Sequence, residues 1–157
     1  ARLRHCLPTM SAWKASRAVL MAKLKNIPSV GHTAHLGISP VDVDPVLGSI
    51  TVSMTVAAGH LAPHSFAHGG ALTALADTAA GWGAWISLAD YSEGLKPFLT
   101  SELKVNFVGS AKEGDELLCQ ARIVHAGKRT QVWDADVTHA DSGKRVALFR
   151  CTQMVLV

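Results

Sequence analysis

An almost uninterrupted apolar run between Gly69 and Leu88 constrains this chain more than any other feature of its sequence. The run reads GGALTALADTAAGWGAWISL and contains one charged side chain, Asp77. It is too long for a β-strand and is rich in Ala and Leu, which are strong helix formers. A helix that is apolar around most of its circumference is buried on most sides. We therefore expect one long helix with the rest of a domain folded around it.

The same run is long enough to cross a lipid bilayer, so a membrane span is the first alternative. Asp77 in its middle and two glycines, Gly81 and Gly83, argue against a span. Residues 26–95 also contain no Lys or Arg, so the charge asymmetry that orients membrane helices is missing. We expect a buried helix of a soluble domain and no membrane partner.

The segments around this helix have the pattern of β-strands. Residues 50–56 alternate between polar and apolar side chains, as a half-buried strand does, within two segments expected to be extended, 35–44 and 46–57. Beyond the helix, turn sequences at hairpin spacing separate four further predicted strands. These strands are 98–109, 117–124, 130–139 and 144–157. One helix followed by a meander predicts an α+β domain in which an antiparallel sheet wraps around the helix.

Lys and Arg are distributed unevenly along the 157 residues. The first 41 residues carry six of them and no acid, whereas the remainder carries nine bases and twelve acids. The body is therefore mildly acidic. It lacks the basic, aromatic-rich surface that nucleic-acid binding requires, and we expect no nucleic-acid partner.

Residues 1–28 are predicted to form a basic arm or short helix ahead of a domain over residues 29–157. An Arg-rich start without acids is similar to a mitochondrial presequence, and Met10 or Met21 is an alternative start. We favour a short amphipathic helix over about residues 9–25. Its apolar side chains would pack on the body: Trp13, Val19, Leu20 and Leu24.

The three cysteines, Cys6, Cys119 and Cys151, are odd in number and show no CxxC spacing. A disulfide scaffold or a thiolate zinc site is therefore not expected, and a reducing compartment, the cytoplasm, is the predicted location. Cys119 and Cys151 fall within predicted apolar strands, where burial makes a thiol a poor nucleophile.

Two other classes of site are disfavoured. His60, His64 and His68 have the spacing of a metal-binding helix face, but Pro63 interrupts such a helix, so no metal site is expected. A serine hydrolase is not indicated either, because the chain has no G-x-S-x-G motif.

Asp77 is the carboxylate that is out of place. A buried carboxylate without a partner is costly, so such a group has either a partner or a task. The structural alternatives are a side chain that faces solvent or one bonded to Thr73 or Thr78.

Nine residues before Asp77, the sequence His68-Gly69-Gly70 opens the predicted helix. The glycines allow a ligand to approach the backbone closely, and the first-turn N–H groups lie at the positive end of the helix dipole. This turn can therefore stabilise a developing oxyanion. The alternative is a helix start that His68 simply caps.

Gly69 and Asp77 are eight residues apart, which is ~12 Å along one helix. One reacting carbonyl group cannot touch both. If the two residues share a site, two copies of the helix must run antiparallel, with Gly69 of one chain facing Asp77 of the other. The residues then require a homodimer with two equivalent sites.

Three stretches around these residues resemble the hotdog-fold acyl-CoA thioesterases of the phenylacetate-pathway (PaaI) type. The stretches are HLAPHSFAHGGALTALADTAAG, TSELKVNFVGSAKEGDEL and ARIVHAGKRTQVWDADV, and the likeness covers roughly residues 30–157. The resemblance implies a hotdog fold and hydrolysis of an aryl- or fatty-acyl-CoA. It also implies a homo-oligomer, dimer or tetramer, that needs no metal and no cofactor, since coenzyme A is part of the substrate.

The resemblance implies roles for individual residues as well. Asp77 is expected to be the catalytic carboxylate, as general base or nucleophile, and Gly69 the N–H donor to the thioester carbonyl. His68 would position this turn, and Thr100 would supply a hydroxyl that orients water near the acid. The remaining candidates contact substrate: Gly70 in the helix-opening turn, Phe66, Trp82 and Trp85 at the acyl group, and Lys128 and Arg129 at the coenzyme A phosphates. Core packing is the alternative for the aromatic side chains, and an ordinary hairpin turn for the two cations.

One position departs from the family pattern. Six residues before His68 the family has Asn or Gln, and this chain has Ala62. Either His64 or a bound water supplies the missing contact, or activity is reduced, or the substrate differs. This departure gives weight to one alternative function, a non-catalytic acyl-CoA-binding hotdog dimer. The other alternative is a different enzyme on the same fold, a hotdog hydratase or dehydratase.

Overall fold

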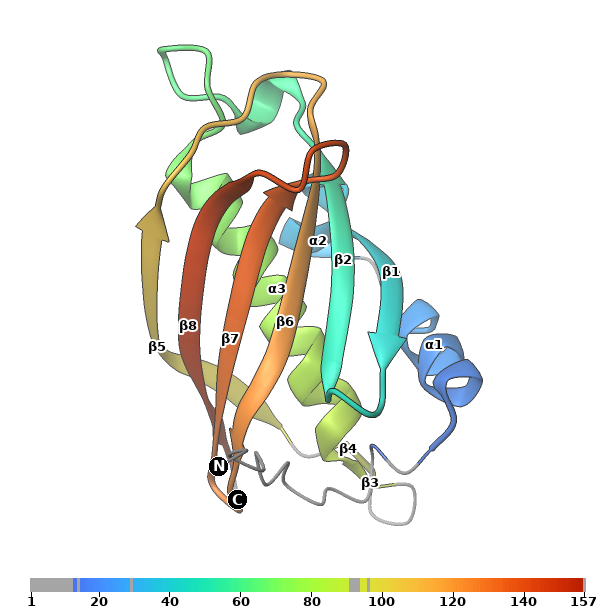
Figure 1. Ribbon diagram of the computed structural model, residues 1–157. Coiled ribbons are helices and arrows are strands. Elements are labelled where there is room, and N and C mark those ends of the chain that lie inside the picture. Colours follow the sequence, from blue (N-terminus) through green and yellow to red (C-terminus); the bar gives the residue numbers. More distant parts are fainter. Residues whose placement is uncertain (1–12, 14, 29, 91–93, 96, 157) are drawn as a thin grey trace, which may run out of the picture.

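Six antiparallel strands form one curved sheet, and a long helix, α3, lies across its inner face in the computed structural model (Figure 1). The structure describes residues 13, 15–28, 30–90, 94–95 and 97–156. The helices are α1 (Arg17–Lys25), α2 (Gly31–His35) and α3 (Gly69–Leu88), with a 3₁₀ turn, η2 (Ala58–His60). The strands of the main sheet are β1 (Ser39–Asp44), β2 (Ser49–Thr55), β5 (Phe98–Phe107), β6 (Glu116–Ala126), β7 (Thr130–His139) and β8 (Arg145–Val155). A short second sheet pairs β3 (Ala89–Asp90) with β4 (Gly94–Leu95).

The order of the strands across the main sheet is β1-β2-β6-β7-β8-β5, with every neighbouring pair antiparallel. The meander predicted from the turn sequences is present, and Gly114 and Gly143 adopt the left-handed backbone that two of those turns need, with φ of 89° and 67°. β7 has the predicted bounds, whereas β5 ends before the predicted Gly109. β5 and β1 are the two edges of the sheet (Figure 1).

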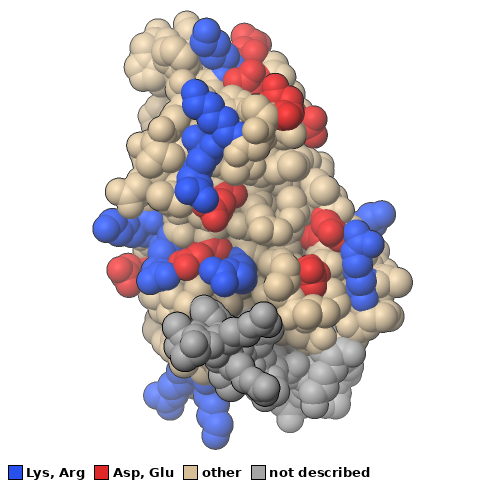
Figure 2. All heavy atoms as spheres, in the orientation of Figure 1, with Lys and Arg blue, Asp and Glu red and all other residues tan. Residues whose placement is uncertain are grey.

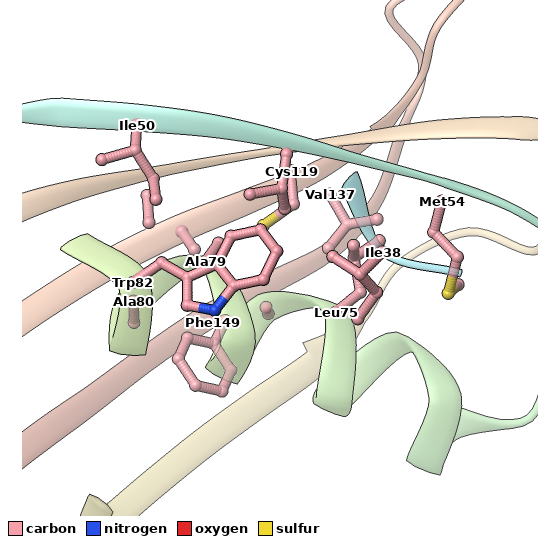
Figure 3. Packing of buried hydrophobic residues seen from close by; sticks show 14 of the residues in the cluster. Ile38, Ile50, Met54, Leu75, Ala79, Ala80, Trp82, Cys119, Val137 and Phe149 are labelled. Atoms are coloured by element: carbon pink, nitrogen blue, oxygen red, sulfur yellow. The ribbon is translucent and has the colours of Figure 1, made fainter. Parts of the chain in front are cut away.

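Helix α3 has the bounds that the apolar run predicted, Gly69 to Leu88. It packs on β2, β6 and β7, and its side chains Leu75, Ala79 and Trp82 meet residues of the sheet such as Ile50 in one hydrophobic core (Figure 3). Within the described residues, no helix is long and apolar enough to span a bilayer.

The basic arm is only partly as predicted. Helix α1 begins at Arg17, capped by the Ser16 hydroxyl, which accepts a hydrogen bond from the Val19 N–H. The predicted helix started at about residue 9; residues 1–12 and 14 lie outside the described residues, and so do Cys6 and Met10. Trp13, Leu20 and Leu24 are buried in the core as predicted. The prediction was wrong for Val19, which is 46% exposed because it lies on the solvent side of α1.

The segment before β1 also differs from the prediction. His35 was expected to begin an extended stretch, but it ends α2, and the strand begins at Ser39. The positive φ of Gly37, 65°, reverses the chain between the two elements. Period-two alternation alone does not locate such a short helix.

The glycines in the middle of α3 make different contacts, which gives a matched test of the packing. A Cβ at Gly83 would lie 2.5 Å from the ring of the fully buried Trp133, whereas a Cβ at Gly81 would meet nothing within 4 Å. We expect Gly83→Ala to lower the free energy of unfolding by about 1–3 kcal/mol through overpacking. Gly81→Ala should raise it by up to ~1 kcal/mol through helix propensity. Urea denaturation measures both, and equal effects would contradict this packing of α3.

Candidate active site

The loop before α3 is a tight hairpin that fixes the start of the helix. Leu61 and Ala67 form an antiparallel bridge, and the His68 N–H donates to the His60 carbonyl at 2.7 Å. The loop is also attached to the segment after β5, because the Ala67 N–H donates to the Ala111 carbonyl at 2.8 Å. These bonds set the position of the first turn of α3 relative to β5.

The His68 side chain caps α3 and leaves one first-turn donor free. Its Nδ1 accepts a hydrogen bond from the Gly70 N–H at 2.8 Å, and its carbonyl accepts from the N–H groups of Ala71 and Leu72. Among the residues that the structure describes, the Gly69 N–H makes no hydrogen bond. His68 is therefore a cap, as the alternative interpretation had it, and Gly69 still presents a single unsatisfied donor at the positive end of the helix.

Phe107, at the end of β5, lies directly beside Gly69. A Cβ at Gly69 would lie 2.9 Å from the tip of the Phe107 ring, so a larger residue at this position requires that exposed ring to move. Gly70 is restricted by its neighbour, because a Cβ there would lie 2.9 Å from His68 Nδ1. The two glycines thus allow both the cap and the close approach to β5.

A pocket of about 480 Å³ opens beside Gly69. Its lining includes residues of the hairpin loop, the first residue of α3 and the end of β5: Ala62, His64, Phe66, His68, Gly69 and Phe107. The Phe66 ring packs near the His64 ring, with centroids 5.7 Å apart, and the Lys112 ammonium lies over its face. Asp77 does not line this pocket.

Asp77 lies two helical turns further along α3, half-buried, and its partner is neither Thr73 nor Thr78. Its Oδ1 accepts a hydrogen bond of 2.8 Å from the Thr100 hydroxyl on β5, while the Thr73 hydroxyl donates to the Gly69 carbonyl. Burial raises the pKa of the Asp77 carboxyl, and the Thr100 hydrogen bond offsets part of this rise. The site therefore holds a desolvated carboxylate with one hydroxyl donor.

A bulge in β5 turns Thr100 toward Asp77. The register with β8 shifts between Thr100 and Glu102, so that Thr100 is paired with Gln153 and Leu103 with Cys151. Gln153 and Cys151 both face the core, so Thr100 and Leu103 share the inner face although they are three residues apart. Without the extra residue, Thr100 would point outward.

Gln153 is a polar residue of the site that the sequence analysis missed. It is fully buried; its Nε2 lies 2.9 Å from Thr100 Oγ1 and its Oε1 lies 3.2 Å from the same oxygen. The available signal was a Gln in phase with the inward-facing Phe149, Cys151 and Val155 of β8.

Four other predicted substrate-binding residues lie, within one chain, away from both Asp77 and the pocket beside Gly69. Trp82 is 8% exposed and lies in the core (Figure 3), while Trp85 is exposed on α3. Lys128 and Arg129 are exposed in the turn between β6 and β7. That turn lies at the far end of β6, ~35 Å along the strand from residues Gly109 and Ser110, which line the pocket.

The histidines of the loop do not form a metal site. His60 is buried, its Nδ1 accepts a hydrogen bond from the Ala57 N–H, and burial lowers the pKa of its imidazole. His68 uses Nδ1 for the helix cap. Across the described part of the chain, no three His, Cys, Asp or Glu side chains are grouped to hold a metal ion.

Comparison with known proteins identifies the family. Residues 64–146 match the Thioesterase superfamily, to which this chain belongs. The chain is 37% identical over 115 residues to the acyl-coenzyme A thioesterase PaaI of Escherichia coli, covering 73% of this chain and 75% of that protein. The resemblance to the PaaI type seen in the sequence is confirmed.

The fold is the hotdog fold. The structure of the E. coli PaaI protein from the phenylacetic acid degradation operon matches with a TM-score of 0.72 and 29% identity, over 93% of this chain and 94% of that one. A Streptococcus mutans protein bound to acetyl-CoA matches with a TM-score of 0.66 and 29% identity, over 76% of this chain and 88% of that one.

The raised pKa of Asp77 predicts how stability depends on pH. A carboxyl group whose pKa is higher in the folded state than the ordinary value of 3.8 destabilises the fold when it is ionised. This penalty is present in full above the folded-state pKa and is lost as the pH falls toward 3.8. Asp77→Asn should therefore have a higher melting temperature than wild type at pH 7, and the difference should shrink at pH 4. A difference that is the same at both pH values would contradict the burial assigned to Asp77.

Proposed function

We propose that this protein is an acyl-CoA thioesterase that hydrolyses an aryl- or fatty-acyl-CoA to the free acid and coenzyme A. The observation that carries the proposal is that α3 presents both a free backbone donor, the Gly69 N–H, and a desolvated carboxylate, Asp77. A thioester hydrolase needs these two groups, one for the developing oxyanion and one to act as base or nucleophile. Membership of the Thioesterase superfamily and the similarity to E. coli PaaI support this assignment.

The site as proposed is shared between two copies of the chain. Gly69 and Asp77 lie on one unbroken helix, eight residues or ~12 Å apart, so one thioester group cannot reach both within a chain. An antiparallel partner helix would bring Asp77 of one chain to Gly69 of the other at two equivalent sites. We propose a homodimer, alone or within a tetramer.

The surface beside α3 supports such a dimer. Within the described residues, β5 is an edge strand that pairs with β8 alone, and Leu103 and Phe107 on its inner face are 42% and 51% exposed. Trp85 on α3 is 37% exposed. An unpaired strand with apolar side chains is a liability in a monomer and a ready interface for a second copy.

The chemistry proposed at this site is a metal-free acyl transfer to water. The Gly69 N–H of one chain donates to the thioester oxygen as negative charge develops there. Asp77 of the other chain either removes a proton from the water that attacks the carbonyl carbon or attacks that carbon itself, giving an anhydride that water then hydrolyses. In both cases the C–S bond breaks and the coenzyme A thiolate leaves. Because a thiolate is a good leaving group, the step needs neither a strong general acid nor a cofactor.

Lys128 and Arg129 are proposed to bind the coenzyme A phosphates across the dimer. Their turn lies at the C-terminal end of α3, because Gln131, just beyond it, bonds to Ser87 in the last turn of that helix. In an antiparallel pair of helices, this end of one chain lies beside the Gly69 end of the other. The two cations would then meet the nucleotide of a substrate whose acyl end lies in the partner's pocket.

The pocket residues are proposed to contact the thioester end of the substrate. Ala62 stands where the family has Asn or Gln, and its methyl group offers no polar contact there. The His64 imidazole, exposed on the same pocket, is proposed to supply that contact directly or through water. Phe66 would pack against the acyl group.

A hydratase or dehydratase needs a histidine near the acid that can remove the Cα proton of the substrate. His68 Nδ1 accepts a hydrogen bond from the Gly70 N–H, so the neutral ring carries its proton on Nε2 and is not a base there, which disfavours these reactions. The second candidate is a non-catalytic acyl-CoA-binding dimer, which the Ala62 departure favours.

The outer face of the sheet carries both signs of charge, with Arg150 paired to Asp134 and Arg145 to Asp136, so the basic surface of a nucleic-acid binder is not formed there (Figure 2). We also propose a cytoplasmic location, in keeping with the buried, free thiols of Cys119 and Cys151.

The test is thiol release from a panel of aryl- and fatty-acyl-CoAs by wild type, Asp77→Asn and a surface control, Asp141→Asn. We expect wild type and Asp141→Asn to hydrolyse the same esters, and Asp77→Asn to be slower by roughly 10²-fold or more. The wild-type rate should fall as the pH drops below the raised pKa of Asp77, because the base must be ionised. Full activity in Asp77→Asn would rule out the proposed role. No release by wild type, with the esters still raising its melting temperature, would favour the binding protein.

A further inference from the structure

Two buried glutamines lie side by side in the sheet, and only one of them is connected to the candidate site. Gln131 on β7 and Gln153 on β8 are paired in register, and both are fully buried. Gln131 bonds to Ser87 and to the Trp133 indole, within the core. Gln153 instead contacts Thr100, the hydroxyl donor to Asp77. A buried amide is costly unless its hydrogen bonds are satisfied, so each is expected to have a specific structural role.

The distances define the direction of the hydrogen bonds. A threonine hydroxyl has one proton, and the contact of 2.8 Å with Asp77 Oδ1 uses it when the carboxylate is ionised. Thr100 Oγ1 is then an acceptor, and Gln153 Nε2, at 2.9 Å, is the donor that faces it. The alternative bond, from the hydroxyl to Gln153 Oε1 at 3.2 Å, is longer and would take the proton away from Asp77.

We propose that Gln153 is a positioning residue, whose carboxamide donates to Thr100 and so commits the Thr100 proton to the ionised Asp77. This inference rests on the proposed function for its kinetic consequence, and on the geometry of three side chains for the rest. Gln153 would act on the reaction through Thr100 and would not touch the substrate. Because chained hydrogen bonds polarise one another, loss of the first bond weakens the second.

Other ionisable groups do not account for the state of Asp77. Cys151, next to Gln153 on β8, faces the same region, but burial raises the pKa of its thiol to about 12, so it is neutral. The charged residues of the neighbouring strands alternate with inward-facing ones and lie on the outer face of the sheet. These are Glu102 and Lys104 on β5, Asp134 and Asp136 on β7, and Arg145 and Arg150 on β8. Among the described residues, the Thr100 hydroxyl is the polar group that bonds to the carboxylate.

The test compares Gln153→Met with Gln131→Met. Methionine is close to glutamine in length and volume but cannot donate, and the two positions match in burial and strand pairing. The readout is the titration of the Asp77 carboxyl by ¹³C NMR without substrate, with the signal assigned by its loss in Asp77→Asn. We expect Gln153→Met to raise the pKa of Asp77 by about 0.5–1 unit, the worth of one weakened hydrogen bond to the charged form. Gln131→Met should leave it unchanged.

The pH dependence of kcat/KM is the second readout, and the direction of its shift follows from the pKa of Asp77. A higher pKa leaves less ionised Asp77 at a given pH, so the acid limb of kcat/KM for Gln153→Met should move to higher pH by the same amount. KM should change little, since Gln153 does not touch the substrate. If Gln153→Met does not fold, Gln153→Asn replaces it, because its shorter amide cannot reach Thr100.

The outcomes separate this inference from the proposed function. An unchanged pKa of Asp77 in a folded Gln153 variant, or an equal shift in Gln131→Met, would overturn the positioning role. A shift confined to Gln153 supports the role even if wild type hydrolyses none of the esters, a result that would count against the thioesterase assignment alone.

Discussion

The length of α3 between Gly69 and Asp77 is the constraint on which the account of this protein depends. The helix is continuous, so the free N–H at its start and the carboxylate two turns later are held ~12 Å apart. Neither can move toward the other, because α3 is packed against β2, β6 and β7 along its length. In the proposed reaction this separation would leave a single chain incomplete, and it suits a pair of antiparallel helices, in which Gly69 of each chain would face Asp77 of the other.

Burial and hydrogen bonding act on Asp77 in opposite directions. The apolar helix that makes the core also desolvates the carboxylate and raises its pKa, while the Thr100 hydroxyl lowers it. The bulge in β5 is what turns Thr100 inward, and β8 contributes Gln153 behind it. Three elements distant in sequence, α3, β5 and β8, therefore act on the pKa of Asp77, although the residue itself lies on α3.

Much of the fold could be predicted because it is encoded locally. The apolar run has the bounds of α3, and turn residues such as Gly114 and Gly143 lie where the hairpins turn. The prediction that Val19 packs on the body was wrong, because the apolar pattern of α1 does not show which side of the helix meets solvent. The prediction that Thr100 lies near Asp77 came from the family resemblance alone. Strict alternation along β5, counted from the inward-facing Leu103, would place Thr100 on the outer face, and a bulge has no clear sequence signal. Gln153 was missed because the β5–β8 pairing is not visible in one sequence.

The most direct measurement of the central claim is complementation between two inactive variants. Gly69→Pro removes the N–H donor, with Gly69→Ala as a control that adds the same Cβ beside Phe107 but keeps the donor. Gly69→Pro and Asp77→Asn chains are mixed in equal amounts, with subunit exchange verified by two affinity tags. If the site is shared, each heterodimer regains one intact site, and activity should return to about a quarter of the wild-type value. No recovery, with exchange demonstrated and Gly69→Ala active, would place the whole site within one chain and contradict the account.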